Sequence, residues 1–134
     1  MNRYTPGMMR LGVAIWTGDI SVSWSAFQNT PATILRWGLA GAAFVACDTG
    51  GFEGGASPPE LLARWYQLSA LMPVMRVHSR VQNPPHWPWL YGPDAEAAMR
   101  AALLLRYQLV PFVYSLAHAT RDTGLPVVRP LLFE

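Results

Sequence analysis

The chain has 134 residues, which is enough for one domain at most. Only 13% of the residues are charged, against about 25% in average proteins, and 12% are aromatic, so a disordered chain is excluded. The formal net charge is +2 and no basic cluster is present, which excludes an electrostatic nucleic-acid-binding protein.

Cys47 is the single cysteine, so an intramolecular disulfide and a cysteine-rich metal site are both excluded. No apolar run reaches the roughly 18 residues that a membrane-spanning helix needs. The first ten residues have no apolar stretch of the kind found in secretory signals. We therefore expect neither a nucleic-acid partner nor a membrane partner. The cellular compartment stays open, because a signal upstream of this chain is compatible with its sequence.

The first third of the chain combines an apolar run with a helical pattern. Residues 11–16, LGVAIW, predict a short buried strand of a parallel sheet. Residues 21–41 then space their apolar side chains as a helix does, and Gly38 or Gly41 is expected to end this helix. Pro31 is expected in the first turn of that helix or at the start of a second, shorter one.

The middle of the chain repeats this order. Residues 42–47, AAFVAC, predict a second buried strand, and residues 58–72 predict a helix. Ser57, with Glu60 three positions later, is a candidate capping box at the start of that helix. Residues 73–78, PVMRVH, predict a third strand that is less apolar than the first two.

The C-terminal third begins with a loop and ends outside this alternation. Residues 83–93 are rich in proline and aromatic residues, which predicts an irregular loop. A long helix is expected over residues 94–122, with a kink at Pro111 and an end at Gly124. Residues 125–134 predict a strand that begins another unit.

This order of strands and helices is typical of an α/β fold whose parallel strands are joined by right-handed crossovers. A closed (β/α)8 barrel takes about 250 residues, so the chain supplies about three of its eight units. Apolar strands with open edges need neighbours, because such edges promote aggregation. The sequence therefore predicts a partial (β/α)8 TIM barrel that belongs to a longer polypeptide or is completed by a partner chain.

Ionisable side chains follow all three predicted strands. Asp19 follows the first strand, Asp48 follows the second, and Arg76 and His78 close the third. The carboxyl ends of parallel strands form the ligand-binding edge of α/β folds, so we expect these groups to converge on one mouth. The alternative is that each group caps a helix or pairs with a neighbour, as a single Asp after a strand often does.

Aromatic side chains stand close to these groups: Trp16 lies three residues before Asp19, and Phe52 lies four residues after Asp48. Flat aromatic faces beside carboxylates suit sugar rings, although core packing explains any single Trp equally well. Two carboxyl groups at one site are the pattern of glycoside hydrolysis, in which one donates a proton and the other attacks or activates water. From spacing alone, Asp19 and Asp48 would form that pair.

Other chemistries find less support. His78, His86 and His118 do not have the spacing of zinc ligands. No G-x-S-x-G nucleophile elbow and no phosphate-binding loop is present. We therefore expect no metal and no organic cofactor. A barrel aldolase or isomerase is an alternative on the same architecture, but a chain without lysine excludes the versions that need a Schiff base.

Five sequence blocks, in order, resemble glycoside hydrolase family 31. They are WTGD at 16–19, CDTGGF at 47–52, MRVHS at 75–79, LRYQLVPFVYSL at 105–116 and LPVVRPLLFE at 125–134. The first three are similar to the family's catalytic barrel, and the last two are similar to the segment that follows it.

This resemblance implies a retaining α-glycosidase, chiefly an α-glucosidase or α-xylosidase, that acts on an oligosaccharide or another α-glycoside. It also implies that residues 1–122 are the C-terminal portion of the barrel, about its last three β/α units with a post-barrel helix. Residues 123–134 would then start the following β domain.

The family resemblance further implies a role for individual residues. Asp19 matches the general acid/base of the family's W-(S/T)-G-D block. The family's substrate-binding positions are matched by Arg3, Trp16, Asp48, Phe52, Arg76 and His78. On this reading Asp48 is a sugar contact and not the nucleophile. The family's nucleophile, the Asp of a W-x-D-x-(N/S)-E block on an earlier strand, has no counterpart in these residues.

Several positions depart from the family pattern. Ile20 stands where the family often has Asn, Thr49 replaces the Ile of D-I-G-G-F, and Trp87 replaces the Glu of E-P-W. Without the nucleophile the double displacement cannot begin, so the chain carries the acid/base half of the site and depends on the missing N-terminal part of the barrel. The alternative is a truncated, catalytically inactive fragment that still binds sugar.

Overall fold

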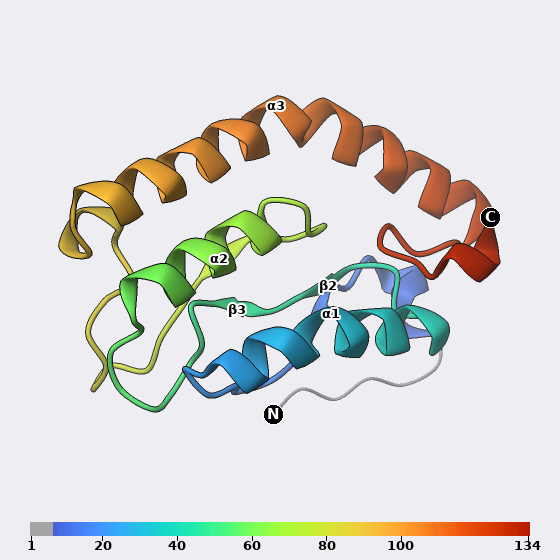
Figure 1. The fold of residues 1–134 in the computed structure, drawn as a ribbon. Helices are drawn as coiled ribbons and strands as arrows, with labels where there is room; N and C mark the ends of the chain where they lie inside the picture. Colours follow the sequence, from blue (N-terminus) through green and yellow to red (C-terminus); the bar gives the residue numbers. More distant parts are fainter. Residues whose placement is uncertain (1–6) are drawn as a thin grey trace.

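The structure, a computed structural model, describes residues 7–134 as alternating strands and helices (Figure 1). The α-helices of this described part are α1 (Trp24–Leu39), α2 (Pro59–Ser69) and α3 (Pro93–Thr123). Its strands are β1 (Ile15–Trp16), β2 (Val45–Ala46), β3 (Asp48–Thr49) and β4 (Arg76–Val77). Short 3-10 helices cover Met8–Leu11, Pro88–Leu90 and Leu131–Phe133.

The strands pair in parallel, as their alternation with helices predicts. β1 lies beside β2, with Ile15 opposite Val45, and β3 lies beside β4, with Asp48 opposite Arg76. Only Cys47 separates β2 from β3, so one segment pairs first with β1 and then with β4. Each strand is two residues long, shorter than the predicted runs. The outer sides of β1 and β4 have no neighbouring strand among the described residues, so the ladders are not extended.

Helix α1 begins at a serine cap and continues through a proline. The Ser23 Oγ accepts a hydrogen bond from the Ala26 N–H at 3.1 Å. Pro31 lies inside this helix, so the prediction that it sits in a first turn or starts a second helix is wrong. The helix tolerates Pro31 because the ring is exposed and only one backbone donor is lost, while Ile34 is buried against β1 and β2. Gly41, at a φ of 87°, turns the chain towards β2, which is one of the two predicted ends.

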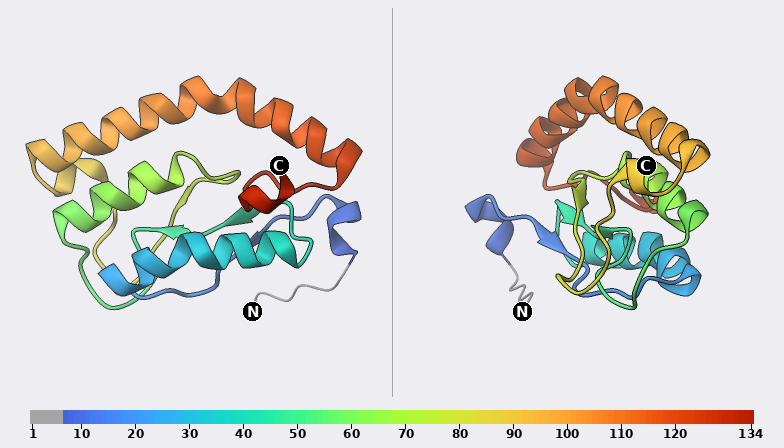
Figure 2. Two further views of the ribbon diagram at one scale, coloured as in Figure 1. Left: turned by 45° about the vertical axis from the view of Figure 1, so that its right-hand side comes forward. Right: turned by 90° about the vertical axis from the view of Figure 1, so that its left-hand side faces the viewer.

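Helix α2 does not use the predicted capping box. Its N-cap residue is Pro58, and the Ser57 hydroxyl donates to the Pro58 carbonyl at 3.4 Å instead of accepting from an N–H. Pro59 in the first turn has no N–H to satisfy, which reduces the need for a side-chain cap. Leu61 packs in the cluster around Cys47, whereas Leu62 packs in a cluster shared with α3, so α2 lies between the strands and α3 (Figure 2).

Helix α3 is a single helix of 31 residues that arches over α2 and the strands (Figures 1 and 2). It continues through Pro111 and ends at Gly124, whose left-handed φ of 78° caps it as predicted. Arg106 fastens the helix to the chain that follows α2, since its guanidinium donates to the carbonyls of Met72 and Pro73. In the part of the chain that the structure describes, no helix combines the length and the hydropathy of a membrane span.

The strand predicted over residues 125–134 does not form. The segment is irregular and ends in a short 3-10 helix. A backbone hydrogen bond of 3.2 Å from the Val127 N–H to the Ala43 carbonyl ties it to the chain before β2. Pro126 and Pro130 have no N–H to donate, so a ladder cannot propagate along this segment.

Candidate active site

The loops that follow β1, β3 and β4 meet at Phe52. The Phe52 N–H donates to the Ile20 carbonyl at 2.7 Å. The Phe52 carbonyl accepts the Arg80 N–H at 2.9 Å and the side-chain amide of Asn83 at 2.8 Å. The carboxyl ends of the strands therefore share one edge, which is the edge where parallel α/β folds bind ligands.

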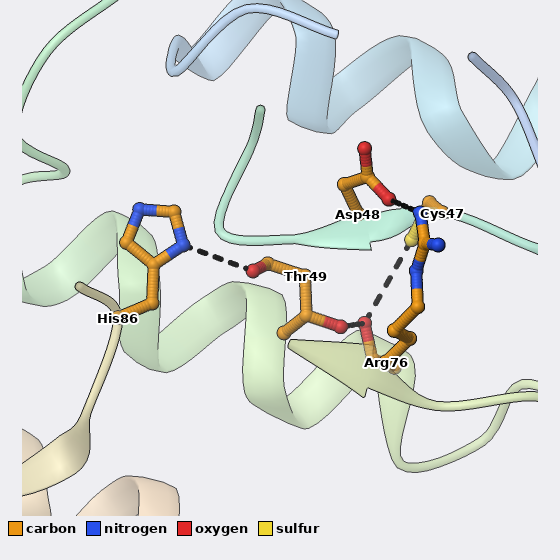
Figure 3. A network of polar contacts seen from close by, with 6 residues as sticks. Cys47, Asp48, Thr49, Arg76 and His86 are labelled. Atoms are coloured by element: carbon orange, nitrogen blue, oxygen red, sulfur yellow. Dashed lines mark hydrogen bonds and ion pairs between the residues drawn. The ribbon is translucent and has the colours of Figure 1, made fainter. Parts of the chain in front are cut away.

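At this edge Asp48 and Arg76 form an ion pair. They face each other on β3 and β4, and the guanidinium Nη2 of Arg76 donates to Oδ1 of Asp48 (Figure 3). The Asp48 side chain is fully buried, whereas that of Arg76 is 44% exposed. The same guanidinium lies over the ring of Trp16, 5.6 Å from its centroid. The structure thus brings together three of the residues that the sequence predicts for the site.

The second carboxylate oxygen of Asp48 is not used by the ion pair with Arg76. Oδ2 is buried and has no hydrogen-bond partner among residues 7–134. A buried carboxylate oxygen without a donor is costly, because the desolvation of its charge is not repaid. A hydroxyl donor on a ligand, or a donor from another part of the protein, would satisfy this atom.

His78 and Phe52 form a second predicted group at the same edge. Their rings are stacked, with centroids 5.4 Å apart and an interplanar angle of 26°. His78 is exposed and Phe52 is half-buried, so the pair presents aromatic and polar surface beside the loop ends. Because His78 follows β4 directly, this pair lies one residue beyond the strand that carries Arg76.

Asp19 lies on the exposed loop after β1, next to Ile20. Among the described residues no hydrogen bond or ion pair holds its carboxylate, so the structure does not bring Asp19 into contact with Asp48. The Ile20–Phe52 backbone hydrogen bond connects its loop to the rest of the edge. Arg3, the remaining predicted site residue, lies outside the described residues.

Behind Asp48 lies a buried polar cluster that the sequence analysis missed. The Thr49 hydroxyl donates to Ser69 Oγ on α2 at 2.8 Å, and Ser69 Oγ lies 3.8 Å from Cys47 Sγ (Figure 3). On the other side of β3, Nδ1 of His86 lies 3.2 Å from the Thr49 carbonyl oxygen. All four side chains are buried. We call Cys47, Thr49, Ser69 and His86 the Thr49 cluster.

Burial sets the protonation states in the Thr49 cluster. It raises the pKa of the Cys47 thiol to about 11, which the hydrogen bond with Ser69 offsets only in part, so the thiol stays protonated at neutral pH. Burial also lowers the pKa of His86, against a smaller opposite effect of the Thr49 carbonyl, so the ring is neutral. Because a carbonyl oxygen only accepts, the ring proton of neutral His86 sits on Nδ1.

Two glycines allow the backbone after Asp48 to approach its neighbours closely. Gly50 and Gly51 have φ values of 100° and 86°, which lie in the region that favours glycine. A Cβ on Gly50 would lie 2.3 Å from His86 Nδ1, and a Cβ on Gly51 would lie 2.9 Å from the Ser21 carbonyl oxygen. The Gly pair therefore serves the packing of β3 on the His86 ring and on the loop after β1.

The opposite end of the strands has different character. A surface cavity of about 390 Å³ is lined there by residues that include Arg10, Phe44 and Thr120, and it contains none of the predicted site residues. It lies at the amino ends of β1 and β2, which in parallel barrels is not the catalytic face. Among the described residues, no group of three or more His, Cys, Asp or Glu side chains is arranged to hold a metal ion.

The edge just described lies within the match to a known domain. The model of the glycosyl hydrolases family 31 TIM-barrel domain matches residues 2–116, which include all four strands of the described part and most of α3. The chain belongs to glycoside hydrolase family 31. The resemblance of the five sequence blocks to this family is thereby confirmed, together with the TIM-barrel class of the fold.

Two relatives illustrate how much of the chain is shared. A probable glucan 1,3-alpha-glucosidase of Oryza sativa subsp. japonica is 42% identical over 128 residues, which cover 96% of this chain and 14% of the relative. The neutral alpha-glucosidase AB of Homo sapiens is 39% identical over 125 residues, which cover 93% of this chain and 13% of the relative. The chain thus spans about one seventh of the length of these relatives.

Solved structures of the family match the fold. A family 31 α-xylosidase from a soil metagenome, complexed with xylose, gives a TM-score of 0.88 at 36% identity and covers 95% of this chain and 22% of its own. A glucosidase II alpha subunit in a Glc1Man2-bound form gives a TM-score of 0.85 at 34% identity, with 95% and 14% covered. Both neighbours were determined with sugars bound.

Proposed function

We propose that this chain is the acid/base half of a retaining α-glycosidase. In this proposal residues 1–122 are the C-terminal portion of a (β/α)8 barrel, about its last three units with the post-barrel helix, and residues 123–134 begin the following β domain. The observation that carries the proposal is the Asp48–Arg76 ion pair at the carboxyl edge of the parallel strands, in a chain of family 31. The pair is placed where such folds bind substrate.

The side chains at this edge divide into polar and aromatic contacts for one sugar unit. Asp48 is fixed by Arg76 through one oxygen, which leaves Oδ2 to accept from a sugar hydroxyl. The exposed imidazole of His78 supplies a second polar contact. Trp16 and Phe52 offer flat apolar surface to the C–H face of the ring. Arg3 would add a further hydroxyl contact, by the resemblance to the family.

Asp19 is the proposed general acid/base. Its protonated carboxyl donates the proton to the glycosidic oxygen as the bond to the anomeric carbon breaks, while an Asp from an earlier strand attacks that carbon. Asp19, now a carboxylate, then takes a proton from water, whose oxygen displaces the enzyme carboxylate and releases the sugar with retained configuration. Its position on an exposed loop beside Phe52 is compatible with reaching a substrate oxygen.

The open surfaces of the chain support a missing N-terminal part of the barrel. Large apolar side chains along α3 are exposed, among them Tyr107 at 76%, Phe112 at 60% and Tyr114 at 66%. The outer sides of β1 and β4 also lack neighbours among the described residues. Several large exposed apolar side chains on one helix, together with unpaired strand edges, are typical of an interface with further protein.

The first test is the DNA sequence upstream of the Met1 codon. A reading frame that continues upstream and encodes a W-x-D-x-(N/S)-E block on an earlier strand supports the proposal. The chain joined to those strands, which we call the complete barrel, should then hydrolyse aryl α-glycosides with retention of configuration, measured by NMR of the first product anomer. A complete barrel that folds but neither hydrolyses nor transfers α-glycosides contradicts the proposal.

A second candidate function is that of a catalytically inactive fragment that binds sugar. The observation that favours it is the absence of the nucleophile block from these 134 residues. Calorimetric titration of the isolated chain with maltose tests it. Saturable heat without any hydrolysis would support a sugar-binding remnant, whereas absence of binding by a folded chain would exclude it.

A further inference from the structure

Thr49 is held on two sides by buried hydrogen bonds. Its hydroxyl donates to Ser69 Oγ at 2.8 Å, which anchors it to α2. Its carbonyl accepts the Nδ1 proton of His86 across 3.2 Å, which anchors it to the loop before α3. His86 is itself fixed, because its own carbonyl accepts the hydroxyl of Tyr66 at 2.8 Å. Thr49, the residue that follows Asp48, is therefore held by hydrogen bonds to two separate elements.

These hydrogen bonds hold Thr49, which is the neighbour of Asp48, the proposed sugar contact. Asp48 and Thr49 are the whole of β3, and β3 pairs only with β4 among the described residues. The next two residues, Gly50 and Gly51, have no side chains with which to anchor the segment. Apart from the ion pair of Asp48 itself, the side-chain anchors closest to Asp48 are thus the Thr49 hydrogen bonds and the weaker 3.8 Å contact of Cys47 Sγ with Ser69 Oγ.

Burial makes these contacts independent of the missing strands. His86 is 1% exposed, and Thr49 and Ser69 are both 0% exposed. Additional protein can only increase the burial of these groups, so their hydrogen bonds remain the available ones in a complete barrel. Neither Thr49 nor His86 belongs to the motif residues that are expected to touch substrate.

We propose that His86 and Ser69 are positioning residues that act through Thr49 to aim the Asp48 carboxylate at the sugar. The inference rests on the proposed function only in naming what Asp48 contacts. Its physical basis is that the hydrogen bonds that sugar hydroxyls donate to a carboxylate tolerate displacements of only a fraction of an ångström, so the backbone carrying the carboxylate must be fixed.

The experiment uses two substitutions of His86 in the complete barrel. His86→Asn places an amide N–H near the position of Nδ1 and keeps the donor, whereas His86→Leu keeps a similar volume and removes the donor. We expect His86→Leu to lower kcat/KM by about 10- to 100-fold, as a misplaced contact does. His86→Asn should restore most of the activity. Ser69→Ala should lower it in the same direction, and it serves where His86→Leu does not fold.

Tyr91→Phe is the matched control on the same loop. The Tyr91 hydroxyl donates to the Pro85 carbonyl at 3.2 Å and makes no hydrogen bond with Thr49 or with the His86 ring. Its removal should lower the free energy of unfolding but leave kcat/KM unchanged. Equal losses of kcat/KM in Tyr91→Phe and His86→Leu would mean that any loosening of the loop has the same effect, which would overturn the inference.

A double-mutant cycle separates positioning from general stability. In an Asp48→Asn background, His86→Leu should lower kcat/KM by less than about threefold further, because the group that it positions is already altered. Full additivity of the two losses would overturn the inference.

Crystal structures of the parent and the His86 variants give a readout that needs no activity. We expect the Asp48 carboxylate to move in His86→Leu and to stay in place in His86→Asn. An unmoved carboxylate in His86→Leu overturns the inference. An inactive parent whose Asp48 still moves in His86→Leu would instead reject the proposed function and leave the positioning role standing.

Discussion

Arg76→Met in the complete barrel is the sharpest test of the charge arrangement at the site. Methionine keeps most of the apolar stem of arginine, so the substitution removes the guanidinium and little packing. It leaves the Asp48 carboxylate fully buried without its ion-pair partner. It also removes the cation from the face of Trp16.

The magnitude follows from the unequal exposure of the two partners. Breaking a fully buried ion pair costs about 3–5 kcal/mol, whereas an exposed pair is worth at most about 1 kcal/mol. Asp48 is fully buried but Arg76 is 44% exposed, so water screens one side of the pair. We therefore expect the free energy of unfolding to fall by about 2 kcal/mol, with roughly 0.5 kcal/mol more from the lost contact with Trp16.

The assay is urea unfolding of four proteins: the parent, Arg76→Met, Asp48→Asn and the double variant. Asparagine is neutral, so in its background Arg76→Met should cost only the roughly 0.5 kcal/mol of the Trp16 contact. The coupling energy of the cycle is then about 2 kcal/mol. A coupling energy below about 0.5 kcal/mol would refute the argument that the buried carboxylate depends on Arg76.

Three further predictions concern single positions. Asp19→Asn should lower kcat/KM for glycosides with poor leaving groups by about 10²- to 10⁴-fold, whereas the glycosylation step with aryl or fluoride glycosides should be affected less. Equal losses of kcat/KM on both kinds of substrate would count against the acid role. Gly50→Ala should destabilise the protein by about 1–3 kcal/mol more than Gly55→Ala. Both glycines have a positive φ, but of the two only Gly50 has a neighbour that a Cβ would meet, at 2.3 Å from the His86 ring. Thermal unfolding of the two variants measures this difference. Because burial lowers the pKa of His86, the unfolded state takes up its proton first as the pH falls below about 6.5, so the parent should lose stability on acidification more than His86→Asn does. Parallel losses between pH 7 and pH 5 in the two proteins, by urea unfolding, would show that this proton uptake does not occur.

That the strand ends share one edge was predictable, because parallel pairing places them there. The short apolar runs predicted where strands form, but not where each one ends. Asp48, predicted to follow the second strand, is instead the first residue of β3, and it lies opposite Arg76, the first residue of β4. The same reasoning failed for residues 125–134, where apolar content predicted a strand but the prolines removed the donors that a ladder needs.

Helix details followed local rules only where packing did not override them. Gly124 ends α3 in the left-handed conformation, as expected of a glycine after a long helix. Pro31 stays inside α1 because burial of the following turn outweighs the loss of one hydrogen bond. The Ser57 capping box gave way to Pro58 and Pro59, which start α2 without a side-chain cap.

The Thr49 cluster could not be predicted, because its hydrogen bonds join residues far apart in sequence. Thr49 and Ser69 are 20 residues apart, and Thr49 and His86 are 37 apart. Which of these polar side chains meet depends on how α2 and the loop before α3 are rotated against β3, and residue spacing carries no such information. Thr49 was visible only as a departure from D-I-G-G-F, and His86 only as a histidine without metal-ligand spacing.

The exposed residues of the site and the buried residues behind them differ in how far their roles depend on the rest of the barrel. Asp19 and His78 are exposed, so their roles depend on the substrate and on strands that this chain does not supply. Thr49, Ser69 and His86 are buried within the chain, so the hydrogen bonds of Thr49 to Ser69 and His86 form without those strands. Substitutions of these buried residues should therefore have the same structural effect in the isolated chain, if it folds, as in the complete barrel. Substitutions of Asp19 should alter catalysis in the complete barrel and leave the folding of either form unchanged.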